Sequence, residues 1–292
     1  MLLRDIRKAE VQPSLGRKAL SPMGIMMAAE PQAEFGTREK SRNVALLLWG
    51  AAIVGVIAGI VFTAFPEIDM KTAALFYEGN GVFSGKGGGG IFYGKSSTAA
   101  DLIRFVLFLA FVGVGIVTAC GLATTVLRGR AFLGFTAPKW LFLAACLVIG
   151  PGVVSNAVLK DNWGRARPVH LADFGGNKTY SPPLFPSNQC EKNCSFVAGE
   201  ASMAYATFFA AAFLFAGLGT RLICAGVLAG LFSGAVRMSQ GAHFLSDVVF
   251  AGVVMAATVA AIYLLFDLIA RTGGGTDPAT GPPNPLARWC SW

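Results

Sequence analysis

The residues with the clearest chemical potential are two groups of charged side chains beside apolar segments. In the first group, Lys160 and Arg167 stand seven residues apart in the segment KDNWGRARP, which Pro168 closes. If a helix continues through this segment, both cations lie on one helix face. A lysine point charge beside a planar arginine fork suits a phosphate group. The alternative is that these basic residues cap a helix C-terminus and contact lipid head groups.

The second group joins a histidine to a carboxylate. Arg237 precedes His243, and Asp247 follows that histidine by four residues, at the expected beginning of a helix. At this spacing the carboxylate can orient the imidazole ring and raise the basicity of its other nitrogen. An oriented imidazole can attack phosphorus as a nucleophile. Taken alone, the pair also fits an ordinary helix N-terminus that carries a surface histidine.

The elements that must position these groups are membrane-spanning helices. Hydrophobic residues make up 54% of the chain and charged residues 14%, and the mean hydropathy is +0.58, which a soluble fold could not accommodate. The apolar residues form long blocks, each close to the ~20 residues that cross the hydrocarbon. We predict an all-α polytopic membrane protein with a bundle of six spans: 43–65, 101–127, 140–159, 196–218, 221–238 and 247–270.

The fifth span, 221–238, is predicted to be the shortest of the six. It carries Gly226, Gly230 and Gly234 at four-residue spacing. This spacing would allow a neighbouring helix to approach closely. Alternatively, these glycines only reflect a glycine-rich membrane composition.

The placement of Lys and Arg predicts the orientation of the spans. Basic residues concentrate in the N-terminal segment, after the second span, between the fourth and fifth spans and after the sixth, which places these parts in the cytoplasm. We expect a flexible basic arm at 1–42, a membrane domain at 43–270 and a disordered tail at 271–292. Three connections, and both groups of charged residues, then face outward: 66–100, 160–195 and 239–246.

The first outward connection contains a run of glycines, 87–90, that we interpret as a flexible link. No Lys-Ser/Thr pair follows it, as a phosphate-binding loop of the Walker type would require. Aromatic residues suggest that parts of this connection lie at the membrane interface: Phe65, Phe76, Tyr77, Phe92 and Tyr93.

The net charge of +8 raises the question of a nucleic-acid partner. The basic residues lie at the ends of apolar blocks, however, and form no basic stripe with interleaved aromatics. An anionic membrane surface or a phosphorylated lipid explains the charge better, so we expect no nucleic-acid partner.

Two of the six cysteines, Cys190 and Cys194, flank a short polar stretch. They would form a disulfide if this loop faces an oxidising compartment. A zinc pair is the competing interpretation, although the chain has only two histidines, His170 and His243, and no second cysteine pair nearby.

The patterns Lys-x6-Arg-Pro and Arg-x5-His-x3-Asp, in this order, resemble the first and third motifs of the type 2 phosphatidic acid phosphatase family. By motif the resemblance covers roughly 150–250, and the six-span organisation extends it to the whole chain. It implies that His243 is the nucleophile and that Asp247 activates it. It also implies that three cations bind the phosphate, Lys160, Arg167 and Arg237, and that no metal or other cofactor is required.

The second motif of that family, Pro-Ser-Gly-His, is altered in this chain. At the beginning of the fourth span Gly199 matches, but Ala198 stands at the serine position and Glu200 at the position of the histidine that protonates the leaving oxygen. The backbone N–H of Gly199 would contact the phosphate. Glu200 would act as the acid if its carboxyl is protonated. The alternative is that Glu200 is a structural ion-pair partner of the cations.

The resemblance implies a metal-independent phosphoric monoester hydrolase in an inner membrane, acting on a phosphorylated membrane lipid from the periplasmic side. The segments 65–69 and 190–200 and the pair Phe76-Tyr77 look like the lipid A phosphatase branch, so lipid A is the first candidate substrate. Alternatives are undecaprenyl pyrophosphate, phosphatidylglycerophosphate, and a catalytically silent lipid-binding or transport protein. Vanadium haloperoxidases share the motifs, but six membrane spans argue against them. The sequence gives no sign of an obligate protein partner.

Overall fold

The computed structural model describes residues 22–78 and 91–273, with side chains from Thr37 onward. The chain divides into two compact units, Met1–Arg38 and Glu39–Trp292. The first unit contributes to the described residues only the beginning of helix α1 (Pro22–Ala64). Three predicted features lie wholly or largely outside the described residues: the first part of the basic arm, the glycine run 87–90 and the tail after 273.

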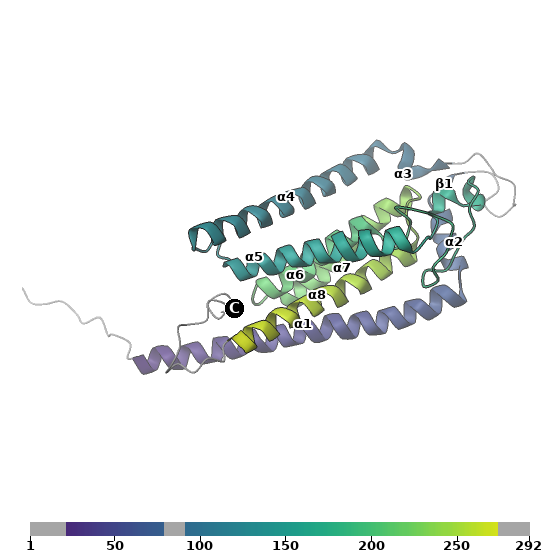
Figure 1. The fold of residues 1–292 in the computed structure, drawn as a ribbon. Helices are drawn as coiled ribbons and strands as arrows, with labels where there is room; N and C mark the ends of the chain where they lie inside the picture. Colours follow the sequence, from purple (N-terminus) through teal and green to yellow (C-terminus); the bar gives the residue numbers. More distant parts are fainter. Residues whose placement is uncertain (1–21, 79–90, 274–292) are drawn as a thin grey trace, which may run out of the picture. The chain divides into compact units, whose positions relative to one another are not determined.

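Long helices dominate the second unit, as the hydropathy predicted (Figure 1). After α1 these are α4 (Thr98–Arg128), α5 (Ala137–Leu147) with its π-helical continuation η1 (Val148–Lys160), α6 (Gly199–Leu214), α7 (Gly219–Ser239) and α8 (Leu245–Gly273). The short elements are α2 (Glu67–Ala74), α3 (Tyr93–Ser96), the 3₁₀ turns η2 (Pro168–His170) and η3 (Ala172–Phe174), and an antiparallel pair, β1 (Tyr77–Glu78) with β2 (Ile91–Phe92). The all-α class and the multi-pass membrane organisation are confirmed.

Five helices in the described part of the chain are long and apolar enough to cross a membrane: Thr37–Ala64, Thr98–Arg128, Ala137–Lys160, Gly219–Ser239 and Leu245–Thr272. The predicted fourth span corresponds to α6, which has only 16 residues. The prediction that 221–238 is the shortest span was therefore wrong. The reason is that Phe196 and Val197 are buried in the preceding loop, where Phe196 stacks on Trp163 at 4.9 Å between ring centroids.

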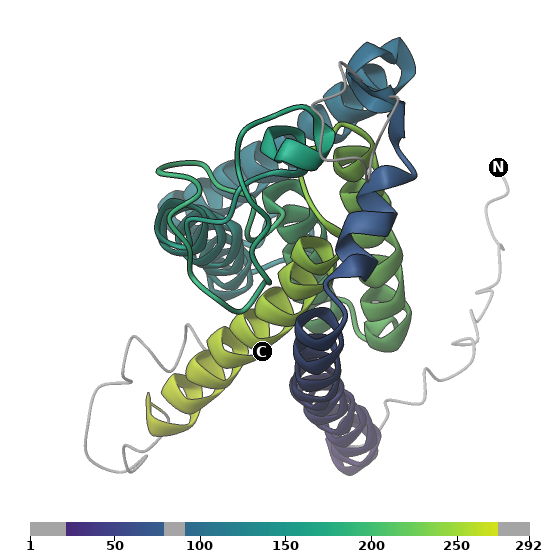
Figure 2. The same cartoon turned by 90° about the vertical axis from the view of Figure 1, so that its right-hand side faces the viewer.

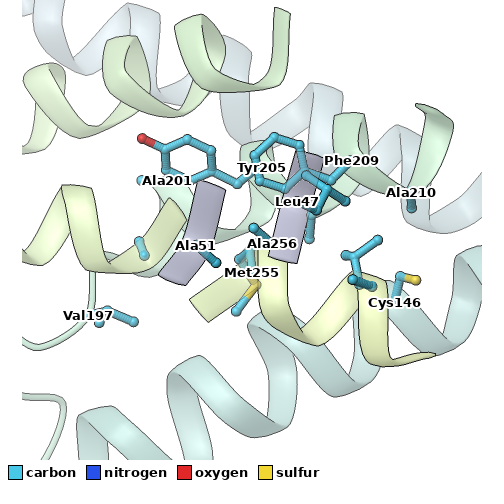
Figure 3. Close-up of a cluster of buried hydrophobic side chains, with 14 of the residues drawn as sticks. Leu47, Ala51, Cys146, Val197, Ala201, Tyr205, Phe209, Ala210, Met255 and Ala256 are labelled. Atoms are coloured by element: carbon cyan, nitrogen blue, oxygen red, sulfur yellow. The ribbon is translucent and has the colours of Figure 1, made fainter. Parts of the chain in front are cut away.

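Helix α6 forms the centre of the bundle, since it packs against α5, η1, α7 and α8 and 10 of its 16 residues are buried. The glycines of α7 permit this packing. A Cβ atom at Gly230 would lie 2.3 Å from the ring of Tyr205, and one at Gly226 would lie 2.8 Å from the Cβ of Phe208. Close helix approach at these glycines is confirmed, and Figure 3 shows Tyr205 within the resulting core.

The connections predicted to share one face do gather at one end of the helices, together with α2, α3 and β1 (Figures 1 and 2). A second, smaller core lies there, in which the rings of Tyr77, Phe92 and Phe174 meet edge to face with centroids 5.2–5.3 Å apart. Tyr77 and Phe92 are buried in this core, whereas Phe65 and Tyr93 are exposed, so among these four residues the latter two remain candidates for contact with a membrane interface.

Candidate active site

His243 lies in the turn between α7 and α8 and is only 2% exposed. Its Nδ1 atom is 2.7 Å from the carbonyl oxygen of Ser195. Because a carbonyl oxygen only accepts hydrogen bonds, Nδ1 carries the proton and Nε2 keeps its lone pair. The loop before α6 therefore selects the tautomer in which Nε2 can act as a nucleophile.

Asp247 supports His243 indirectly. Its Oδ2 atom lies 3.7 Å from Nδ1 of His243, which is too long for a hydrogen bond. The same oxygen accepts hydrogen bonds from the hydroxyl of Ser195 and from the backbone N–H of Phe244. The expected direct contact between neighbours on one helix does not form, because His243 precedes the first residue of α8. Asp247 instead holds the two segments that carry the ring and its hydrogen-bond acceptor.

The electrostatic environment keeps the imidazole neutral. Burial, chiefly, lowers the pKa of His243 from its ordinary 6.5 to about 4. The cations Lys160 and Arg167 act in the same direction, and Asp247 opposes them. At neutral pH the ring therefore has its lone pair available, and two of the expected phosphate ligands lie close enough to affect its charge.

Lys160 ends η1 and reaches the first turn of α6. A Cβ atom at Gly199 would lie 3.0 Å from the Lys160 ammonium nitrogen and 3.0 Å from the Asn156 side-chain oxygen. A larger residue at position 199 would displace the lysine. Gly199 thus lets a cation and the N–H groups of a helix N-terminus share one small space, which is a favourable arrangement for an anion.

Arg167 and Arg237 have donors left for a phosphate. Arg167 uses Nη2 to bind the backbone and side-chain oxygens of Asn193, both at 2.8 Å. Arg237 donates from Nη1 to Gln240, and its buried Nε has no hydrogen-bond partner in the described part of the chain. Arg167 also donates from Nε to the Asn193 carbonyl at 3.2 Å, so its Nη1 is the nitrogen left for a phosphate, and Arg237 keeps its Nη2.

Lys160 and Arg167 do not lie on one face of a continuous helix, as the sequence predicted. The helix ends shortly after Lys160, and Gly164 adopts a left-handed conformation with φ of +70°. At Gly164 a Cβ atom would lie 1.6 Å from the carbonyl oxygen of Ser187, so only glycine fits. The turn at Gly164 leads into the loop segment that carries Arg167.

Glu200, at the altered position of the second motif, forms ion pairs with two arginines. Its Oε1 atom lies 2.9 Å from Nε of Arg104 on α4 and 3.5 Å from Nε of Arg237 on α7. The Glu200 side chain is 32% exposed and that of Arg104 is 46% exposed. This geometry agrees with the alternative interpretation of Glu200 as an ion-pair partner of the cations.

Arg165 is a central residue whose role the sequence interpretation missed. Its side chain is fully buried and donates to Asp247, to Asp69 at 2.8 Å and to the Ser181 carbonyl at 2.8 Å. Its guanidinium carbon also lies 4.4 Å from the ring centroid of Phe244. Asp69, from α2, also accepts a bond from the backbone N–H of Ser246 at 2.9 Å. The only available signal was that Arg165 and Asp69 are charges at the ends of apolar blocks.

Cys190 and Cys194 form a disulfide in the structure, with Cα atoms 5.7 Å apart. The bond closes a small loop that contains Asn193, the partner of Arg167. Within the described residues there is no group of three or more His, Cys, Asp or Glu side chains that could hold a metal ion.

Comparison with known proteins matches residues 139–270 to the PAP2 superfamily. The chain is 38% identical over 219 residues to the lipid A 4'-phosphatase of Francisella tularensis subsp. novicida, covering 73% of this chain and 92% of that protein. The chain belongs to the PAP2 superfamily. It is also 36% identical to the lipid A 4'-phosphatase of Rhizobium leguminosarum, over 65% of this chain and 83% of that protein, and no solved structure matches significantly.

Membership of the PAP2 superfamily confirms the resemblance drawn from the first and third family motifs. The chain is accordingly a multi-pass membrane phosphatase of the phosphomonoester hydrolase class, with a lipid substrate. The matched region contains every residue of the candidate site from Lys160 to Asp247.

Proposed function

We propose that this PAP2 protein hydrolyses a phosphomonoester of lipid A at the periplasmic face of an inner membrane. The observation that carries the proposal is the fixed tautomer of His243, whose Nδ1 is tied to Ser195 while Lys160 and Arg167 lie nearby. The choice of lipid A, and of its 4'-phosphate, follows the names of the relatives, which are all lipid A 4'-phosphatases.

In the proposed mechanism, Lys160, Arg167, Arg237 and the N–H of Gly199 bind the phosphoryl oxygens and offset charge in the transition state. Nε2 of His243 attacks the phosphorus in line, and the bond from phosphorus to the lipid oxygen breaks. The lipid alkoxide takes a proton from water. The hydroxide left by that water then attacks the phosphohistidine, the bond from nitrogen to phosphorus breaks, and inorganic phosphate leaves the neutral ring.

We assign Glu200 a different part from the acid role that the sequence suggested. Its ion pairs with Arg104 and Arg237 support a carboxylate that orients the Arg237 guanidinium toward the phosphate. The family histidine at this position would supply a proton, so the proposed reaction relies on water for that step.

The proposed orientation places the site in the periplasm and Arg128, Arg130, Lys139 and Arg221 in the cytoplasm. Arg130 lies in the connection from α4 to α5, and the other three lie in the helix turns next to the connections at the end of the bundle opposite α2 and α3 (Figure 1). Basic residues in such positions favour the cytoplasmic side. The same orientation places the basic arm (1–42) and the tail (271–292) in the cytoplasm. A cysteine introduced at the exposed Asn177 should react with an impermeant reagent in intact cells. Reaction only after permeabilisation would overturn the orientation.

The activity can be tested with purified protein in detergent micelles. We expect release of inorganic phosphate from lipid A and a product that is lighter by one phosphate in mass spectrometry. Undecaprenyl pyrophosphate and phosphatidylglycerophosphate in the same micelles measure the alternative substrates. A faster release from either of these lipids than from lipid A would reject the proposed substrate, and release from none would reject the activity.

A further inference from the structure

A cavity of about 500 Å³ opens beside the candidate phosphate ligands. Its lining includes Arg167 and Arg237, and also three basic residues outside the family motifs: Lys95, His170 and Lys192. A volume of this size is typical of pockets that hold a whole small molecule. The cavity therefore has room for more of the head group than the phosphate that is removed.

The surroundings of His170 are rich in positive charge. Burial lowers the pKa of His170, and the cations Arg167, Lys95 and Lys178 lower it further, with no carboxylate opposing them. Across the described ranges, neither Lys95 nor Lys192 forms a salt bridge with an acidic side chain. Asp101 also lines the cavity, where it accepts a hydrogen bond from Gln240.

The backbone holds these cations in place. Lys95 belongs to α3, which lies so close to α7 that a Cβ atom at Gly94 would be 2.4 Å from the hydroxyl of Ser239. Lys192 lies within the loop closed by the Cys190–Cys194 disulfide. Next to it, the backbone N–H of Asn193 donates to Asp161 at 3.1 Å. The side chains of Lys95 and Lys192 are exposed, but the backbone that carries them is fixed at the cavity.

The backbone around His170 is fixed in the same way. The carbonyl oxygen of His170 accepts bonds from the N–H groups of Asn177 at 3.0 Å and Lys178 at 2.9 Å. A Cβ atom at Gly176 would lie 2.1 Å from that oxygen, so the loop folds tightly over His170. Three separate segments, α3, the disulfide loop and the turn at His170, thus converge on one cavity.

We propose that Lys95, His170 and Lys192 form a second anion site, which binds another phosphate group of the same lipid molecule while Lys160, Arg167 and Arg237 hold the phosphate to be removed. This inference rests on the proposed function, since it assumes a lipid head group with two phosphates. The second site would fix which end of such a head group faces His243. It thereby selects the position that is hydrolysed and favours the doubly phosphorylated lipid over the singly phosphorylated one.

The test compares two matched phosphoglycolipids with identical acyl chains on a glucosamine disaccharide. One carries only the phosphate to be removed, and the other carries a second phosphate on the other sugar. The wild type, the double variant Lys95→Gln/Lys192→Gln and the control Lys71→Gln are assayed in neutral detergent. Lys71 is an exposed lysine of α2 that does not line the cavity. Native mass spectrometry measures binding of both lipids separately from turnover.

We expect the wild type to have a KM about tenfold lower for the lipid with two phosphates, as partly exposed charge-assisted contacts would give. The double variant should lose this preference while kcat and the KM for the other lipid stay unchanged, and Lys71→Gln should behave as the wild type. If the double variant shows an equal rise of KM for both lipids relative to the wild type, or no rise for either lipid, the proposal of a second site is overturned.

Two further outcomes separate the possible failures. If the wild type hydrolyses neither lipid but binds the doubly phosphorylated one more tightly, and the double variant does not, the proposed function fails and the second site stands. If added phosphatidylglycerol lowers the KM for the singly phosphorylated lipid in the wild type only, the second anion comes from a neighbouring lipid. That result would overturn its assignment to the same substrate molecule.

Discussion

Two groups of charged residues flank His243, and they differ in how well their charges are matched. In the first group, Asp69, Arg165 and Asp247 are fully buried, and the two carboxylates share the Arg165 guanidinium and further hydrogen-bond donors. In the second group, the cavity with Lys95 and Lys192 is open and has more cations than carboxylates. The charges of the buried group already have partners within the protein, whereas Lys95 and Lys192 in the open group would gain one from an anionic ligand. We infer that the first positions the nucleophile and that the second binds the anionic substrate.

The largest effect is expected at the residue between the two groups. His243→Ala should lower turnover by about three powers of ten or more, because the nucleophile is lost while the phosphate ligands remain. Phosphate release and lipid binding should be measured on the same preparation. Retained binding with lost turnover would separate the nucleophile from the anion site.

A matched control is Asp247→Asn, which should lose less activity than His243→Ala. The attacking nitrogen remains, and the Ser195 carbonyl still accepts from the ring. If His243→Ala keeps a large part of the wild-type rate, His243 is not the nucleophile. The roles assigned to the two groups, which depend on that nucleophile, would then be wrong.

Arg165→Met should break the buried group. The substitution leaves Asp69 and Asp247 buried without their cation, and breaking a buried pair in this way costs about 3–5 kcal/mol. The control is Arg104→Met in the open group, where the ion pair with Glu200 is partly exposed and contributes at most about 1 kcal/mol. Unfolding in detergent should show a much larger loss for Arg165→Met. Equal losses would mean that the two groups do not differ as described.

The buried group could not be found from one sequence, and the reason is physical. Arg165 pairs with residues 96 and 82 positions away, and no local pattern encodes contacts at that separation. The long apolar blocks predicted the helical bundle, and the motifs predicted that His243 and Lys160 belong to one site. The loop at Gly164 could not be predicted, because its geometry depends on contact with the Ser187 carbonyl. The apolar composition likewise predicted a longer helix than α6, since Phe196 and Val197 pack inside a loop.

A pH series can sharpen the comparison through His243 itself. The folded protein binds this proton with a pKa of about 4, and the unfolded chain with one near 6.5. Between these values the unfolded state binds more protons, so the free energy of unfolding rises with pH. The stabilising contribution of His243 is lost as the pH falls from about 6.5 to about 4. The loss should total roughly 3 kcal/mol, since the ring is buried.

His243→Gln should remove that part of the pH dependence, because glutamine does not titrate. The acidic limb of kcat/KM in the wild type should have its midpoint near pH 4, where the lone pair is protonated. Melting temperatures and rates measured from pH 4 to pH 8 test both statements. An acidic limb near pH 6.5 would show that the surroundings of His243 do not lower its pKa.

The smallest effect is expected at Glu200, whose ion-pair partners Arg104 and Arg237 line the open cavity. Glu200→Gln should reduce kcat/KM by no more than about fivefold, because ion pairs between partly exposed groups contribute about 0.2–1 kcal/mol. The reduction should be the same for a lipid with an alkyl leaving group and for a substrate with an acidic phenol leaving group, since orienting Arg237 affects both equally. An acid catalyst would behave differently. Its loss would slow the alkyl substrate by roughly two to four powers of ten and leave the phenol nearly unaffected. Such a difference between the two substrates would show that Glu200 is the proton donor. Equal small losses would support its role as an ion-pair partner of the cations.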